Sequence, residues 1–159
     1  MEVGRTMIQI KTSKTADTRS CDFTKVTKEQ LKESSIQHIG DVAEGLLFFT
    51  DMLFSAQVFH DKDKITNLKQ FHKDFIGGFK NTTWWDNHRK ITRHHLQQAD
   101  GVPEDVNLID VLEMIVDCVM AGMARNLAGF YPPTIEPDVL MKAFNNTVEL
   151  LKKNVEVIV

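Results

Sequence analysis

Apolar residues recur at intervals of three and four through most of the chain, the spacing that places them on one face of an α-helix. The first 26 residues lack that pattern and are polar apart from the segment MIQI, which predicts an irregular arm with room for one short strand. Thr27 is followed by Glu29 and Gln30, an arrangement typical of a helix N-cap. We therefore expect the first helix to begin at Thr27.

The helical period resumes at Ile36 and continues to a histidine–aspartate pair, His60 and Asp61, so this stretch fits one long helix or two consecutive ones. Asn107 predicts the N-cap of a later helix, and the paired prolines of the segment YPPT interrupt the chain before the last one. The segments with a helical period after Asp61 are 68–79, 82–95, 108–126 and 136–157.

No strands alternate with these helices and no segment repeats, so the predicted fold class is all-α. A length of 159 residues suits one hydrophobic core better than two. We therefore expect a single-domain bundle of about five to seven helices over 27–159, with residues 1–26 as an N-terminal arm.

Composition narrows the functional classes. A net charge of −3 and a pI near 6.1 give no general attraction for a nucleic-acid polymer. Two cysteines, Cys21 and Cys118, supply neither a thiolate zinc site nor a disulfide framework. The first residues lack a signal-peptide core, and no run approaches the ~18 to 20 apolar residues that cross a bilayer. We expect a soluble cytoplasmic protein without a membrane partner.

The six histidines carry the candidate chemistry. On a helix over 82–95, His88 and His95 share the apolar face with Trp84, whereas Arg89 and Arg93 lie opposite and are expected in solvent. His94 lies about a quarter turn off the apolar face, so it joins a site only if the helix ends or loosens there.

Two upstream histidines also fall on an apolar face: His38 aligns with Val42 and Leu46, and His60 closes the same apolar run. A single histidine of this kind is ordinarily a core residue bonded to a backbone carbonyl. Four such histidines and the adjacent Asp61 favour a shared site instead.

The helix over 108–124 is apolar around most of its circumference and has one narrow polar arc, which holds Asp110, Glu113 and Asp117. Such an arc faces either a slit open to solvent or a polar site inside the protein. A buried carboxylate needs a compensating cation or hydrogen-bond donors, so the inward imidazoles favour a metal site that includes Asp117.

The order of these residues resembles the H…HD…D signature of the HD-domain superfamily of metal-dependent phosphohydrolases, over about residues 36–125. Lys64, three positions after the His-Asp pair, fits the same pattern. Small HD-like proteins of bacteria and phages share the pair His94 and His95 and the "EM..D" of the helix that contains Asp117. The stretch HHLQQADGVP is also similar to the motif of cyclic-dinucleotide phosphodiesterases. The spacing of the histidines departs from that branch, so the resemblance does not imply specificity for cyclic dinucleotides.

The resemblance implies one or two divalent metal ions, of Mn, Fe, Co, Ni, Zn or Mg, with Asp61 able to bridge two of them. Asp61 would be catalytic, and Lys64 would be catalytic and bind the substrate phosphate. Trp84 would stack on a nucleobase, although such a tryptophan is more often a core residue. The implied metal ligands are His38, His60, Asp61, His88, His94, His95 and Asp117.

The predicted function is hydrolysis of a small phosphorylated substrate, expected to be a nucleotide phosphomonoester, by a metal-activated water. Within enzymes, the alternatives are a phosphodiesterase for cyclic or signalling nucleotides and a triphosphohydrolase for deoxynucleoside triphosphates. An alternative of another class is a non-catalytic helical interaction protein with a structural metal. The last amphipathic helix either packs on the bundle or forms a homo-oligomer.

Overall fold

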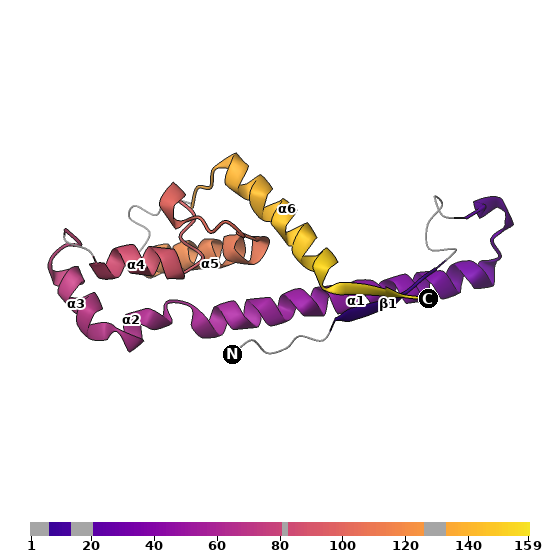
Figure 1. Ribbon diagram of the computed structural model, residues 1–159, viewed down its shortest axis with the longest axis horizontal. Coiled ribbons are helices and arrows are strands. Elements are labelled where there is room, and N and C mark those ends of the chain that lie inside the picture. The colour runs from indigo at the N-terminus through magenta and orange to yellow at the C-terminus, as the bar shows by residue number, and fades with distance from the viewer. Residues whose placement is uncertain (1–6, 14–20, 81–82, 126–132) are drawn as a thin grey trace. The chain divides into compact units, whose positions relative to one another are not determined.

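The computed structural model describes residues 7–13, 21–80, 83–125 and 133–159. These residues form α-helices and one small sheet, which confirms the all-α prediction (Figure 1). Backbone contacts divide the chain into two compact units, one comprising 1–51 with 149–159 and the other comprising 52–148. Both boundaries between the units, after residues 51 and 148, therefore fall within helices.

The first unit contains a two-stranded parallel sheet. β1 (Ile8–Lys11) pairs with β2 (Val155–Ile158), and Ile8 lies opposite Val155. β1 is the short strand for which the arm has room; a short 3₁₀ turn, η1 (Phe23–Lys25), follows it. β2 corrects the prediction of a helix to residue 157, because its β-branched residues favour an extended chain and β1 supplies its hydrogen-bond partners.

The helix α1 (Lys28–Phe59) is continuous, which decides between the one-helix and two-helix alternatives (Figure 1). Its N-cap is the predicted one. Thr27 Oγ1 accepts a hydrogen bond from the Gln30 N–H at 3.2 Å, and Gln30 Oε1 accepts one from the Thr27 N–H at 3.0 Å. This reciprocal capping box satisfies two backbone donors that the helix itself leaves unpaired. Gln37 also donates to the Lys11 carbonyl at 2.6 Å, which joins α1 to β1.

The helical stretch Lys28–Thr66 is long enough to cross a membrane, and one window of 18 residues within it is apolar enough to do so, with a mean hydropathy of 1.3. The expectation that no part of the sequence approaches this requirement is therefore wrong, because scattered polar residues do not lower the average of the window sufficiently. Core helices of soluble proteins and N-terminal signal sequences meet the same criterion. The finding assigns no location to the protein, and the cytoplasmic location stays a prediction.

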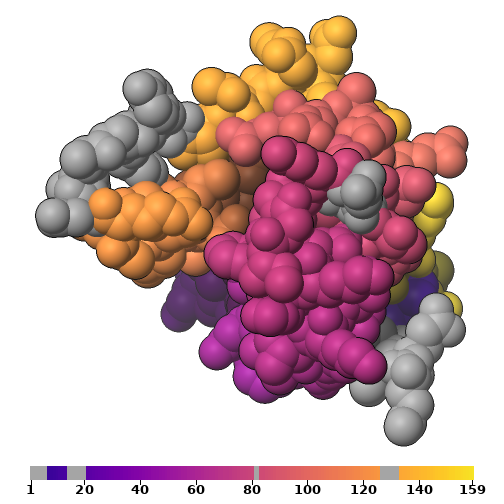
Figure 2. Space-filling model, turned by 90° about the vertical axis from the view of Figure 1, so that its left-hand side faces the viewer, coloured from indigo at the N-terminus to yellow at the C-terminus, as the bar shows by residue number. Residues whose placement is uncertain are grey.

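The second unit contains the end of α1 and the helices after it. The elements are α2 (Lys62–Thr66), α3 (Leu68–Ile76), α4 (Thr83–Ile91), the 3₁₀ turn η2 (Ala99–Gly101), α5 (Leu108–Ala124) and most of α6 (Pro137–Lys153). α3 ends at Ile76, next to the paired glycines as predicted, whereas α4 ends at Ile91 instead of continuing to His95. In the space-filling view of Figure 2 the magenta segments of α2 and α3 lie at the front.

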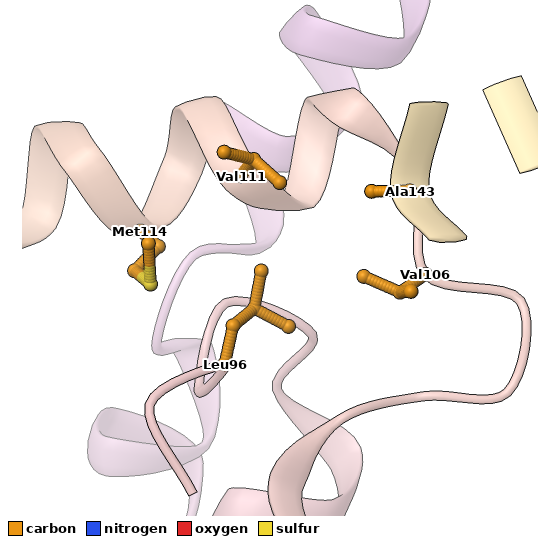
Figure 3. Close-up of a cluster of buried hydrophobic side chains, with 5 residues drawn as sticks. All are labelled: Leu96, Val106, Val111, Met114 and Ala143. Atoms are coloured by element: carbon orange, nitrogen blue, oxygen red, sulfur yellow. The ribbon is translucent and has the colours of Figure 1, made fainter. Parts of the chain in front are cut away.

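A cluster of buried apolar side chains forms the core of the second unit (Figure 3). Leu96 follows α4, Val106 precedes α5, Val111 and Met114 belong to α5, and Ala143 belongs to α6. Burial of each larger side chain contributes about 1.5–3 kcal/mol. The cluster therefore holds the segment after α4 against α5, and both of these elements carry candidate site residues.

Candidate metal centre

Four histidines and four carboxylates, together with Lys64, converge in the second unit from three parts of the chain. The junction of α1 and α2 supplies two of the predicted metal ligands, α4 and the turn after it supply three, and α5 supplies one. Two further carboxylates, which the sequence did not assign to the site, join them. The converging side chains are His60, Asp61, Asp63, Lys64, His88, His94, His95, Glu113 and Asp117.

Asp61 lies at the centre. Its backbone adopts the left-handed conformation, with a φ of 50°, between the end of α1 and the start of α2. Aspartate tolerates this region better than most residues. The turn ends the helical path of α1, so the Asp61 side chain does not continue the helical arrangement of the residues before it. Its Oδ1 lies 3.4 Å from His88 Nε2 and 3.5 Å from His94 Nε2. Its Oδ2 lies 3.5 Å from His60 Nε2 and pairs with Lys64 Nζ.

One side of the centre, which we call the His60 pole, consists of His60, His94, Asp61 and Asp117. Asp117 Oδ1 lies 3.7 Å from His60 Nε2, and Asp117 Oδ2 lies 4.0 Å from His94 Nε2. The other nitrogen of each histidine, Nδ1, donates to the same oxygen, Glu113 Oε1, at 2.8 and 3.0 Å. Both Nε2 atoms therefore face the two aspartates.

The other side, the His88 pole, consists of His88, His95, Asp61 and Asp63. His88 is fully buried, and its Nδ1 donates to Asp63 Oδ2 at 2.8 Å. Its Nε2 lies 2.9 Å from His95 Nε2. Two imidazole nitrogens at this distance either share one hydrogen or bind the same ion side by side. Asp61 belongs to both poles, as expected of a residue that bridges two ions.

The end of α4 brings His94 into the site. The prediction made this residue a ligand only if the helix ended or loosened there, and α4 ends at Ile91. Arg93 then fixes the turn: its Nε and Nη2 donate to both carboxylate oxygens of Asp110, at 2.8 and 2.9 Å. Asp110 also completes the capping box of α5 with Asn107, the predicted N-cap. The expectation that Arg93 is a solvated residue is therefore wrong, because Arg93 ties the turn to the start of α5.

Three buried atoms of the centre have no hydrogen-bond partner among the described residues: Asp61 Oδ1, Asp63 Oδ1 and His94 Nε2. Leaving such atoms unpaired costs about 1–3 kcal/mol each. Ligand atoms at about 2.0–2.2 Å from one ion lie roughly 3 to 3.5 Å from one another, close to the 3.5 Å that separates Asp61 Oδ1 from His94 Nε2. The mixed imidazole and carboxylate set suits Mn, Fe, Co, Ni or Zn. The residues present fit one or two divalent ions.

The charges in this arrangement support one another. Burial raises the pKa of Asp61, but the hydrogen bond and charge of Lys64 outweigh it and hold that pKa below the ordinary 3.8. Burial opposes protonation of His94, yet the hydrogen bond and charge of Glu113 give a net rise in its pKa and a fall in that of Glu113. Burial, followed by the charges of the neighbouring imidazoles, lowers the pKa of His95 to about 4. His95 is therefore neutral at pH 7, the form that binds a metal.

His38, a predicted ligand, is not part of this centre. It lies in the first unit, is exposed, and belongs to none of the possible metal-binding groups found among the described side chains. The prediction required the chain to turn between His38 and His60. α1 is continuous from His38 to Phe59, the residue before His60, so about six helical turns separate the two histidines and they cannot bind the same ion.

Trp84, predicted to bind substrate, is a core residue. It is 2% exposed and packs against Phe71, at 4.4 Å between ring centroids, and against His88, at 4.6 Å with nearly parallel rings. Its backbone N–H donates to Asp74, which is also buried. A nucleobase has no access to either face, so the predicted stacking role is wrong. Trp84 instead supports the His88 ring from behind.

Two residues of the centre were missed from the sequence. Asp63 was not singled out for the site, and Glu113 was placed in a polar arc without a role. Each lies close in the sequence to a predicted ligand, which is the signal that could have identified it. Asp63 follows Asp61 by two residues. Glu113 precedes Asp117 by four, which places it on the same face of α5.

No family model, no curated protein and no solved structure matches the chain. The likeness to the HD-domain superfamily therefore stays a resemblance of the residues quoted for it, and the function is argued from the geometry of the centre.

Proposed function

We propose that the protein is a metal-dependent phosphohydrolase that acts on a small phosphorylated substrate, with a nucleotide phosphomonoester as the first choice. The observation that carries the proposal is the buried, unpartnered pair Asp61 Oδ1 and His94 Nε2 within a set of imidazoles and carboxylates, next to the cation Lys64. The choice of a nucleotide rests on the resemblance to the HD-domain superfamily.

The two poles assign the ligands. His60, His94 and Asp117 would hold one ion, and His88 with His95 a second, while Asp61 contributes an oxygen to each. Bound divalent ions would lower the pKa of a coordinated water and polarise the phosphoryl group.

Lys64 is the residue that would bind the phosphate. Its Nζ reaches Asp61 Oδ2, and its side chain is one third exposed, so it is accessible to a ligand from solvent. A lysine in this place supplies a positive charge to a non-bridging phosphoryl oxygen. Arg89 and Arg93 are less suitable, because the carboxylates with which they pair, Asp100 and Asp110, belong to neither pole, whereas Lys64 pairs with Asp61 at the centre of both.

The test uses the full chain and the isosteric variant Asp61→Asn, which removes one charge from the centre of both poles. The purified protein should contain about one or two divalent ions per chain, measured by elemental analysis. With Mn²⁺, Co²⁺ or Mg²⁺ added, it should release phosphate from nucleotide monophosphates, and Asp61→Asn should reduce the rate at least about 100-fold. Asp138→Asn, at an exposed position on α6, is the matched control and should retain the wild-type rate.

Two results overturn the proposal. The first is a wild-type protein that contains its metal and hydrolyses no member of a panel of phosphomonoesters, phosphodiesters and nucleoside triphosphates, which would indicate a structural metal. The second is hydrolysis that persists undiminished in Asp61→Asn.

A further inference from the structure

One carboxylate oxygen serves two histidines in the His60 pole. Glu113 Oε1 lies 2.8 Å from His60 Nδ1 and 3.0 Å from His94 Nδ1. The Glu113 side chain is 15% exposed and comes from α5, whereas the two histidines come from the end of α1 and the turn after α4. An ionised carboxylate only accepts hydrogen bonds, so each Nδ1 must carry its hydrogen. The contact therefore selects the same tautomer in both rings.

The tautomer decides which atom is left to bind an ion. With hydrogen on Nδ1, the lone pair of a neutral imidazole is on Nε2. His60 Nε2 lies 3.5 Å from Asp61 Oδ2, and His94 Nε2 lies 3.5 Å from Asp61 Oδ1. Both lone pairs are thus directed to the side of the two rings on which Asp61 and Asp117 lie.

We propose that Glu113 is a positioning residue that holds His60 and His94 in the Nδ1–H tautomer, so that both present Nε2 to one metal ion. This inference rests on the proposed metal centre. Glu113 does not touch the substrate or the reacting atoms. It acts through the two rings, whose centroids lie 4.6 Å apart, by fixing their orientation relative to each other.

Glu113 has a competing role, that of a ligand itself, since Glu113 and the Nδ1 atoms of His60 and His94 could also surround an ion. That arrangement leaves the buried Nε2 of His94 without any partner among the described residues. The positioning role gives every nitrogen of both rings a partner: Nδ1 binds Glu113, and Nε2 binds the ion. Buried polar atoms are rarely left unpaired, which favours the positioning role.

The His88 pole repeats the arrangement with a different carboxylate. His88 Nδ1 donates to Asp63 Oδ2 at 2.8 Å, and His88 Nε2 faces Asp61 Oδ1 at 3.4 Å. Carboxylates that hold the far nitrogen of a metal-binding histidine typically change metal affinity 10–100-fold when they are removed. Glu113 differs from Asp63 in holding two rings, so its loss should disturb two ligands at once.

The first experiment measures the tautomers without any metal. In the metal-free full chain at pH 9, ¹⁵N NMR of the histidine side chains should show His60 and His94 with hydrogen on Nδ1 and none on Nε2. Glu113→Ala should shift both rings toward the Nε2–H form, which predominates in free histidine. Glu113→Gln keeps an oxygen acceptor, so it should retain the wild-type tautomers in part.

The second experiment measures binding of Co²⁺ by calorimetry and by its visible spectrum. Affinity should fall 10–100-fold in Glu113→Ala and less in Glu113→Gln. Glu104→Ala, which removes an exposed glutamate from the loop before α5, is the matched control and should bind Co²⁺ like the wild type. A wild-type protein with hydrogen on Nε2 of either ring overturns the inference, as does a Glu113→Ala variant with unchanged tautomers and affinity.

The two proposals can fail separately. Predicted tautomers and weakened Co²⁺ binding in a protein that hydrolyses no phosphate ester would support the role of Glu113 and overturn the phosphohydrolase. Hydrolysis by a wild-type protein with the opposite tautomers would do the reverse.

Discussion

Gly101 is the residue through which the placement of His95 can be tested most directly. Gly101 is buried at the end of η2, and a Cβ added to it would come closer than 3.0 Å to the carbonyl oxygen of His95. Ordinary contact begins at 3.4 Å, so in Gly101→Ala the two segments must separate by more than about 0.4 Å, the difference between these limits. The obstacle is backbone and cannot rotate away. A metal ligand tolerates about 0.2 Å, so the change should reach the ion.

The expected cost has two parts. Overpacking at a site of this kind destabilises a protein by about 1–3 kcal/mol, which urea unfolding in EDTA would measure. Displacement of His95 should also weaken Co²⁺ binding, measured by calorimetry on the folded variant. Gly45→Ala is the control, because an added Cβ there meets nothing within 4 Å and the residue lies inside α1. That variant should gain about 0.5–1 kcal/mol. Wild-type stability and Co²⁺ affinity in Gly101→Ala would refute the reasoning.

Two further predictions concern the same segment. In the folded protein the pKa of His95 is lowered from 6.5 to about 4. Between these two pH values His95 binds a proton in the unfolded chain but not in the folded chain, so the free energy of unfolding decreases as the pH falls from 6.5 toward 4. In EDTA, His95→Gln should therefore lose less stability than the wild type over that range, as measured by urea unfolding. An equal loss in the two proteins would show that His95 is not the source of the pH dependence. Leu96→Ala should cost about 2–5 kcal/mol because Leu96 is 2% exposed, whereas Leu112→Ala at a largely exposed position should cost less than about 1 kcal/mol. Equal costs in the two variants would place the core elsewhere.

Local signals in the sequence predicted much of the helical structure. Thr27 and Asn107 cap α1 and α5 because a short polar side chain before an apolar period has one favourable role. The paired glycines end α3 for a similar reason. The end of α4 has no such signal, since Thr92 and Arg93 are compatible with a helix. It is set by the contact of Arg93 with Asp110, which lies 17 residues further along.

The sequence placed some histidines in the site correctly and His38 wrongly, because a helical wheel contains no information about contacts between helices. A helical wheel ranks residues by the face on which they lie and does not say what covers that face. It grouped His38 with His60, although a continuous helix keeps them about six turns apart. A substrate role for Trp84 fails for the same reason, because the ring is 2% exposed and packs against Phe71 and His88. Contacts between helices decide both cases, and one sequence does not contain them.

The carboxylates show how the search could have been extended. A buried histidine has two nitrogens, and each needs a partner, so a metal site with three buried imidazoles requires carboxylates or carbonyls beyond the metal ligands. Here the additional carboxylates are sequence neighbours of the predicted ones: Asp63 is close to Asp61, and Glu113 lies one helical turn before Asp117. In each pair one carboxylate faces the ion site while the other holds the imidazoles. Because an acid three or four residues from another on a helix shares its direction, as Glu113 does with Asp117, such neighbours are one place where the outer partners of a predicted metal site should be sought. Asp63 does not follow this rule, since it is two residues from Asp61, whose backbone is left-handed.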